Sequence, residues 1–295
     1  MKHPDLRHCT CGIIILYHPD IPLLLKNIEG SYTQVERLYL IDNTENYSGY
    51  AETLQTIANV CHIPLGRNTG IAHALNVGCR IALEAGFKWA VTLDQDSVLP
   101  PGYIDACTRF LASKACHKIG IAGVTWNAGN CTENRQANRV FRVITSGSLT
   151  SLTAWEAVGG FKDELFIDCV DTEFCLNLLK NDYEVWQLSH IRLDHRLGNN
   201  TSDICIAGKH LCYATHHHAS RYYYMARNNL YVSALYRNIF PQYAKVLRKE
   251  LRNLIAKIIL FEKGKQSKLS SVWQGIRDYR HHITGPLTDK TPTIA

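Results

Sequence analysis

The first part of the chain alternates between short apolar runs and segments with helical periodicity. Residues 12–17 form a β-branched run that ends at His18-Pro19-Asp20, as expected of a buried strand. The same pattern predicts further strands at 38–41, 60–65, 89–93 and 119–124, and helices at 21–28, 51–58 and 71–85, with another helix opening at 100–102. Strands that alternate with helices indicate an α/β fold, with a mostly parallel sheet and helices on both faces.

The pattern changes after Leu193. Residues 195–220 are polar and predict a loop, in which His216-His217-His218 is interpreted as a solvated turn. Residues 221–240 and 244–261 predict helices rich in aromatic and basic side chains, and residues 284–295 are expected to be frayed. We therefore expect an α/β domain over residues 1–203 and a helical region over residues 204–295.

Charge separates these two parts of the 295-residue chain. From Arg221 onward there are 14 Lys and Arg against 4 Asp and Glu, a net charge of +10, whereas the first 220 residues have 18 basic and 22 acidic residues, a net charge of −4. Basic and aromatic helices suit anionic lipid headgroups, and are equally compatible with aromatics packed inward and cations facing water. We expect peripheral association with the inner face of the cytoplasmic membrane, and no nucleic-acid partner; the sequence does not indicate an oligomeric state.

Cysteine usage and the lack of apolar segments bear on location. The 11 cysteines contain no Cys-x-x-Cys pair, which argues against a structural zinc site, and Cys79 and Cys175 lie in apolar runs where a thiol acts as a small hydrophobe. The polar start of the chain and the lack of any run of about 18 apolar residues predict a cytoplasmic protein without a membrane-spanning helix.

Asp94-Gln95-Asp96 directly follows the predicted strand at 89–93. Two carboxylates one residue apart can hold a hard divalent cation, which would stabilise a diphosphate leaving group. The alternative is a polar turn in which Asp96 acts as a cap. Tyr17-His18 and Asp42-Asn43 also follow predicted strands, and ligands of such sheets bind beyond the carboxyl ends of the strands, so we expect a single site at this edge.

Other candidate residues each have a structural alternative. Asp42 could accept a hydrogen bond from a nucleotide base, or form an Asx-turn. Asn68 and Gly70 precede a predicted helix, where backbone N–H groups suit a phosphate or are simply capped.

Two further candidates lie later in the chain. The cluster Asp168-Cys169-Val170-Asp171-Thr172-Glu173 could supply a general base, or carboxylates favoured by the helix dipole. His195 could bind a metal ion through neutral imidazole, although a lone histidine is more often structural.

The order of the motifs resembles that of the inverting glycosyltransferases of family 2, which have the GT-A fold. The resemblance covers most of the chain and rests on Asp42-Asn43, Asn68-Thr69-Gly70-Ile71-Ala72 through Asn76, Leu93-Asp94-Gln95-Asp96-Ser97, Gly159-Gly160-Phe161 and Val170-Asp171-Thr172-Glu173. More narrowly, the chain looks like bacterial rhamnosyltransferases, through Phe166-Ile167-Asp168, Val170-Asp171-Thr172-Glu173-Phe174-Cys175, His195 with Gly198, and Arg221-Tyr222-Tyr223-Tyr224 leading to Arg227-Asn228.

The resemblance implies a role for each motif. Residues 1–203 would form the GT-A catalytic domain, with Tyr17, Asp42, Asn68, Gly70, Asp94, Gln95 and Asp96 binding the nucleotide sugar. Asp94 and Asp96, with Asp96 the more direct ligand and His195 a further one, would hold Mg²⁺ or Mn²⁺. Asp171 would be the general base, with Asp168 its rival. Val170 and Asn177 depart from the family, which has Glu and often Arg at these positions.

The implied reaction is a single displacement with inversion. The donor suggested by the resemblance is dTDP-rhamnose, and the acceptor a saccharide or lipid-linked saccharide in the synthesis of O-antigen, lipopolysaccharide or capsule. UDP-galactofuranose or a UDP-hexose is an alternative donor, and a non-catalytic carbohydrate-binding or scaffolding homologue is an alternative of another class. A dehydrogenase is disfavoured because no Gly-x-Gly-x-x-Gly follows the first strand.

Overall fold

The computed structural model describes residues 6–45, 49–114, 117–125, 137–195, 202–206, 209–214 and 216–287. The chain divides into two compact units, Met1–Lys162 with Val170–Arg196, and Asp163–Cys169 with Leu197–Ala295. The division therefore falls before the expected boundary at residue 203. The second unit also contains Asp163–Cys169, a segment that the sequence assigned to the first domain.

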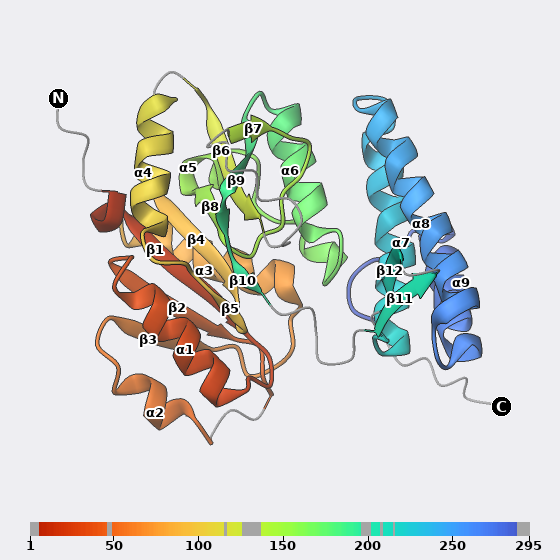
Figure 1. Ribbon diagram of the computed structural model, residues 1–295, viewed down its shortest axis with the longest axis horizontal. Helices are drawn as coiled ribbons and strands as arrows, with labels where there is room; N and C mark the ends of the chain where they lie inside the picture. The colour runs from red at the N-terminus through yellow and green to blue at the C-terminus, as the bar shows by residue number, and fades with distance from the viewer. Residues whose placement is uncertain are drawn as a thin grey trace. The chain divides into compact units, whose positions relative to one another are not determined.

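The first unit is built on an eight-stranded sheet with the order β3-β2-β1-β4-β8-β6-β9-β7 (Figure 1). The strands are β1 (Thr10–Leu16), β2 (Arg37–Asp42), β3 (Val60–Pro64), β4 (Trp89–Asp94), β6 (Ile119–Thr125), β7 (Ala137–Arg139), β8 (Ser148–Ser151) and β9 (Glu184–Arg192). The half from β3 to β4 is parallel, as expected. The other half is mixed, because β8 runs antiparallel to both β4 and β6, and β7 antiparallel to β9.

Helices cover both faces of this sheet, as the alternating pattern predicted. They are α1 (Ile21–Tyr32), α2 (Ala51–Gln55), α3 (Ile71–Glu84), α4 (Tyr103–Ser113), α5 (Leu152–Ala157) and α6 (Val170–Lys180), after a short 3₁₀ helix, η1 (Leu6–Cys9). Ile14 of β1 belongs to one buried cluster with side chains of α1 and α4. Its neighbour Ile13 faces α3, where a Cβ on Gly78 would lie 2.6 Å from Ile13 Cγ2. Successive strand residues thus face opposite helical layers.

Within the described residues, the second unit contains three helices, a 3₁₀ turn and a β-hairpin. Its elements are η2 (Asp163–Leu165), β11 (Ser202–Ile206), β12 (Lys209–Ala214), α7 (Ala219–Tyr236), α8 (Pro241–Phe261) and α9 (Lys265–Arg280). Buried apolar residues of the helices, Tyr222, Ala226, Leu251, Ile258 and Val272, form its core. No helix among the described parts of the chain is long and apolar enough to cross a membrane.

Two expectations about residues 195–220 are wrong. The antiparallel pair β11 and β12 lies within the stretch predicted as a loop. The histidine run is not a solvated turn throughout, since the His216 side chain is largely buried, with Nδ1 2.8 Å from Glu262 Oε2. His218 is the N-cap of α7 and accepts a hydrogen bond from Ser220 N–H.

Candidate functional site

The ends of three neighbouring strands bring the predicted acidic residues to one edge of the sheet. In the parallel register, Leu16 of β1 pairs with Asp42 of β2, and Ile15 pairs with Asp94 of β4. The structure therefore places Tyr17, Asp42 and Asp94 together at the carboxyl ends of adjacent strands, as the sequence predicted.

The turn that follows β4 is fixed from both sides by buried polar groups. The Asp94 N–H donates to Ser146 Oγ at 3.0 Å, and the Asp94 carbonyl accepts from Asn27 Nδ2 of α1 at 2.8 Å. Ser146 Oγ in turn donates to Ser97 Oγ at 2.8 Å. Asn27 and Ser97 are fully buried. Such supporting hydrogen bonds hold the side chains of a site in one geometry.

Gln95 links this turn to the end of β1. Its Oε1 accepts from the Tyr17 N–H at 2.8 Å, and its Nε2 donates to the Tyr17 carbonyl at 3.2 Å. Tyr17 is 45% exposed, and its ring packs edge-on against the His18 ring. An aromatic ring at this position is available to pack on the flat face of a ligand.

Asp94 and Asp96 are the candidate ligands for a divalent cation, because carboxylate oxygens are the ligands that such a cation prefers. Asp94 and Asp96 are half-buried, on a turn whose backbone is fixed by hydrogen bonds. The two-stranded pair β5 (Ser97–Val98) and β10 (Asp194–His195) places the backbone of His195 opposite Ser97. The His195 side chain lies outside the described residues. Within the described residues, this turn included, no group of three or more His, Cys, Asp or Glu could hold a metal ion. A cation bound by two carboxylates would therefore complete its shell with substrate phosphates and water, as Mg²⁺ commonly does.

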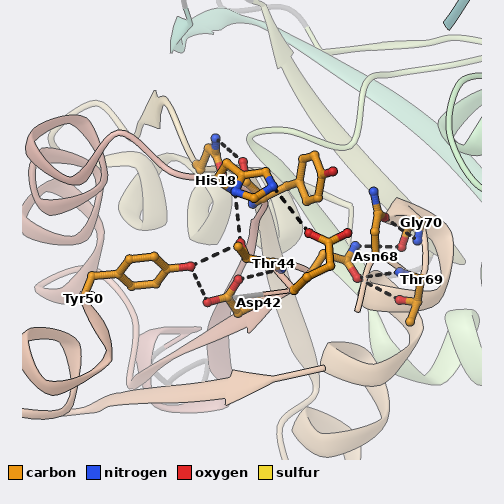
Figure 2. Close-up of polar contacts among 11 residues, drawn as sticks. His18, Asp42, Thr44, Tyr50, Asn68, Thr69 and Gly70 are labelled. Carbon is orange, nitrogen blue, oxygen red and sulfur yellow. Dashed lines mark hydrogen bonds and ion pairs between the residues drawn. The ribbon is translucent and has the colours of Figure 1, made fainter. Parts of the chain in front are cut away.

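Asp42 is enclosed by donors from its own chain (Figure 2). Its Oδ2 accepts from Tyr50 Oη at 2.7 Å and His62 Nε2 at 2.8 Å, and its Oδ1 accepts from the Thr44 N–H at 2.9 Å. Burial alone would raise the pKa of Asp42, but hydrogen bonds from His62, Tyr50 and Thr44 outweigh it and lower that pKa. The contact with Thr44 is the Asx-turn that was the structural alternative. A nucleotide base that donates a hydrogen bond to Asp42 would therefore bind a carboxylate that already accepts hydrogen bonds from Tyr50, His62 and Thr44.

Sequence reasoning missed His62 and Tyr50. His62 pairs with Leu40 in the register of β2 and β3, so it lies on the same face of the sheet as Asp42, two residues along. Because this register is set by the packed sheet, no local signal in the sequence pointed to His62.

The Asn68–Gly70 turn, labelled in Figure 2, is attached through hydrogen bonds to Asn43, which directly follows β2. Asn43 Nδ2 donates to the Gly70 carbonyl at 3.0 Å, and its Oδ1 accepts from the Thr69 N–H at 3.1 Å and Thr69 Oγ1 at 2.8 Å. Asn68 Oδ1 accepts from the Gly70 N–H at 3.0 Å. Gly70 has φ 84° and ψ 160°, a conformation that only glycine adopts readily. The turn thus presents the N-terminus of α3 at the same sheet edge, where its backbone N–H groups suit a phosphate.

Asp171 lies in the first turn of α6. Its Oδ1 accepts from the Thr172 N–H at 2.7 Å. One turn later, Cys175 Sγ contacts the backbone N–H of Val143 at 3.5 Å and its carbonyl at 3.8 Å. Val143 precedes Ser146, the partner of Asp94, by three residues, a span of at most about 11 Å. One short loop therefore contacts both α6 and the turn after β4.

Asp168 belongs to the second unit. The Arg221 guanidinium pairs with it through Nε and Nη2 at 3.2–3.3 Å, and Asn228 Nδ2 donates to the carbonyls of Ile167 and Asp168 at 2.7 and 3.1 Å. Burial raises the pKa of Asp168, although the charge of Arg221 opposes this. Of the two candidate bases, only Asp171 shares a unit with Asp94 and Asp96.

Asn76 of α3 is hydrogen-bonded to the loop that contains the glycine pair at 159–160. Its Oδ1 accepts from the Phe161 N–H at 2.8 Å and Trp155 Nε1 at 3.0 Å, and its Nδ2 donates to the Phe161 carbonyl at 2.7 Å. Gly160 has φ 77°, and a Cβ there would lie 2.7 Å from Asn76 Oδ1. Asn177, where the sequence differs from the glycosyltransferases it resembles, donates to the Val158 carbonyl at 2.9 Å and so supports the same loop.

Comparison with solved structures identifies the architecture. S. aureus TarS, residues 1–349 in complex with UDP-GlcNAc, has a TM-score of 0.56 at 11% identity, over 93% of this chain and 82% of TarS. GalNAc-T7, solved with UDP, GalNAc and Mn²⁺, has a TM-score of 0.53 at 10% identity, over 63% of this chain. This chain spans 43% of that GalNAc-T7 chain. The fold is the GT-A fold of glycosyltransferases, as the motif order implied.

A sequence relative makes the class more specific. The dTDP-rhamnosyl transferase RfbF of Shigella flexneri is 29% identical over 238 residues, which cover 74% of this chain and 77% of RfbF. No family model matches the chain. In fold and in sequence the chain is therefore similar to glycosyltransferases, and its similarity to RfbF supports the resemblance to rhamnosyltransferases.

Proposed function

We propose that the protein transfers L-rhamnose from dTDP-rhamnose, with inversion, to a saccharide or lipid-linked saccharide in the synthesis of a cell-surface polysaccharide such as O-antigen or capsule. The observation that supports this most is the convergence of the ends of β1, β2 and β4 on Asp94-Gln95-Asp96. The similarity to RfbF, whose name gives dTDP-rhamnose as donor, supports the choice of sugar.

In this proposal the donor lies along the sheet edge. Tyr17 packs on the nucleotide, the loop held by Asp42 borders the base, and the backbone at Asn68–Gly70 faces a phosphate at the start of α3. Asp94 and Asp96 would hold Mg²⁺ or Mn²⁺, with His195, whose backbone pairs with Ser97, as a further ligand, and the ion would supply positive charge to the leaving diphosphate. Gln95 keeps the acidic turn against Tyr17.

Asp171 is the proposed general base. Thr172 fixes the orientation of its carboxylate, which then accepts the proton of the acceptor hydroxyl as that oxygen attacks the anomeric carbon. Asp168 remains the rival base: burial raises its pKa, which suits a base, whereas the ion pair with Arg221 stabilises the carboxylate and opposes that role.

We place the protein in the cytoplasm, with its second unit associated with the inner face of the cytoplasmic membrane. This unit exposes apolar side chains on α8 and α9, with Ile259 50%, Leu260 63% and Trp273 63% exposed. The excess of positive charge from Arg221 onward would attract anionic headgroups to the same unit.

A donor screen tests the proposal. Purified protein with Mg²⁺ or Mn²⁺ is offered dTDP-rhamnose, UDP-galactofuranose and UDP-glucose, and release of the nucleoside diphosphate is measured. We expect turnover with dTDP-rhamnose. Turnover only with a uridine donor would favour the alternative transferase, and saccharide binding without any turnover would favour a non-catalytic homologue.

A further inference from the structure

Two adjoining cavities lie between α4 and β9 in the first unit. The first, of about 360 Å³, is lined by Pro100, Pro101, Gly102, Tyr103, Ala106, Arg109, His190, Ile191 and Arg192. The second, of about 380 Å³, shares Ala106, Arg109 and His190 and extends to Lys114. Each volume is within the range of small-molecule sites.

Positive charge is concentrated in this pair of cavities. Arg109, Lys114 and Arg192 line them together with His190, and the described lining residues include no Asp or Glu. Arg109 and Arg192 are exposed, and within the described residues neither forms an ion pair. Cations gathered in a concave surface without a counter-charge attract anions. The guanidinium group of arginine can donate two parallel hydrogen bonds to two oxygens of one phosphate.

The cavity wall is shaped by an irregularity in β9. Val124 of β6 pairs with Leu188, but the next residue, Thr125, pairs with Arg192, so residues 189–191 bulge out of the strand. The bulge brings His190 and Arg192 to the cavity. Bulges of this kind redirect side chains and are frequent beside functional sites.

The same wall adjoins the candidate donor site. Arg192 precedes Asp194 by two residues, Asp194 pairs with Val98, and Pro100 follows Val98 by two residues. Pro100 and Arg192 line the first cavity, and each is three residues away from one member of the Ser97–His195 pair. Three residues span at most about 11 Å.

We propose that this pair of adjoining cavities is a second anion site, separate from the donor diphosphate, that takes a phosphate or diphosphate ester. Three lysine and arginine cations match the two or more negative charges of such a group better than the single charge of a carboxylate. We assign the ester to the acceptor, an assignment that rests on the proposed function, and a free phosphate ester is the other source of the same chemistry.

Direct binding tests the site. The protein is saturated with dTDP and Mg²⁺ to fill the donor site, and glucose 1-phosphate is titrated by calorimetry with glucose as the uncharged control. We expect glucose 1-phosphate to bind, and the double variant Arg109→Gln/Arg192→Gln to bind it at least tenfold more weakly while its affinity for dTDP stays within twofold.

The matched control is Lys26→Gln/Lys88→Gln, which removes two exposed charges of the first unit that do not line the cavity. Its affinity for glucose 1-phosphate should be unchanged. No binding by the wild type, equal binding by glucose, or equal loss in both double variants overturns the site. Failure of dTDP itself to bind contradicts the proposed function instead, and glucose 1-phosphate is then titrated without it.

Turnover separates the two sources of the ester. An acceptor saccharide is compared with and without a phosphate ester, in the wild type and in Arg109→Gln/Arg192→Gln. If the ester belongs to the acceptor, KM for the esterified saccharide should be at least tenfold higher in the variant than in the wild type. In the same comparison, kcat and the KM for the plain saccharide should stay within twofold. Unchanged KM values, together with weaker binding of glucose 1-phosphate, overturn the acceptor assignment and identify a site for a free phosphate ester.

Discussion

At the scale of single residues, amide and hydroxyl side chains hold the half-buried acids in place. Asn27 and Ser146 bind the backbone on both sides of Asp94, and Gln95 holds Tyr17, so the side chain of Asp96 is presented by a turn with little freedom. A site organised in this way loses affinity when its charged group is changed, without losing its backbone geometry.

Asp96→Asn is expected to remove metal-dependent donor binding. The substitution keeps the size of the side chain but removes a charged oxygen ligand, which a hard divalent cation requires. Calorimetry with dTDP, with and without Mn²⁺, should show no gain from the metal in the variant. Asp105→Asn, an exposed acid in the first turn of α4, serves as the control. A full metal effect in Asp96→Asn would rule out Asp96 as a ligand.

Asp171→Asn is expected to leave dTDP affinity within about twofold and to lower kcat by 10²-fold or more, because an amide cannot accept the proton of the acceptor hydroxyl. The matched control is Asp182→Asn, since Asp182 has φ 60°, a conformation that Asn tolerates. If Asp171→Asn keeps its turnover and Asp168→Asn loses it, the base is Asp168.

At the scale of elements, the turn before α3 is the feature most sensitive to a small change. Gly70→Ala would force a side chain into φ 84° and ψ 160°, at a cost of about 1–3 kcal/mol. The turn should relax away from Asn43, and dTDP affinity should fall by about tenfold or more. Gly49→Ala is the control, because a Cβ on Gly49 meets nothing within 4 Å. Equal dTDP affinity in both variants would contradict a phosphate role for this turn.

The junction of α8 and α9 should make stability depend on pH. Burial would raise the pKa of Glu262, but hydrogen bonds from Lys268 and His216 outweigh it and lower the pKa to about 2. Because the folded pKa is depressed, the stabilisation, about 3 kcal/mol, is present above the ordinary pKa near 4.5 and lost as pH falls toward 2.

Glu262→Gln should therefore lower the free energy of unfolding at pH 7, and the difference from wild type should shrink between about pH 4.5 and pH 2. Urea denaturation across this range measures it. Glu164→Gln, which changes an exposed acid of the same unit, should show no such difference. A constant difference at all pH values would mean that the Glu262 charge is not its source.

At the scale of the whole molecule, the two ends of the chain differ in charge. The protein should bind vesicles that contain phosphatidylglycerol, because the part from Arg221 onward has a net charge of +10. Salt should weaken this binding, since the Debye length falls from about 10 Å at 0.1 M to about 3 Å at 1 M. Sedimentation with vesicles measures it, and pure phosphatidylcholine vesicles are the control. Equal binding to both, or none, would end the membrane proposal.

The sequence predicted much of the first unit because its signals are local. Periodicity within single segments gave β1, β2, β3, β4 and the helices between them, and the position of Asp94 directly after a strand gave its place at the sheet edge. The burial of Cys79 and Cys175 followed equally from their apolar neighbours. These features depend on residues within a few positions of one another, and hydrophobic periodicity is a signal over such short windows of sequence.

Tertiary structure decided what depends on distant residues. The antiparallel β8 lies between β4 and β6 through pairs such as Trp89 with Ser151, and Asp42 is enclosed by His62, 20 residues away. No local pattern specifies such partners, because strand pairing and buried hydrogen bonds are selected by the free energy of the whole packed unit. The sequence by itself therefore determined which acidic residues lie at the strand ends. Only the tertiary structure determined that Asp42, unlike a free acid, is surrounded by hydrogen-bond donors of the protein itself.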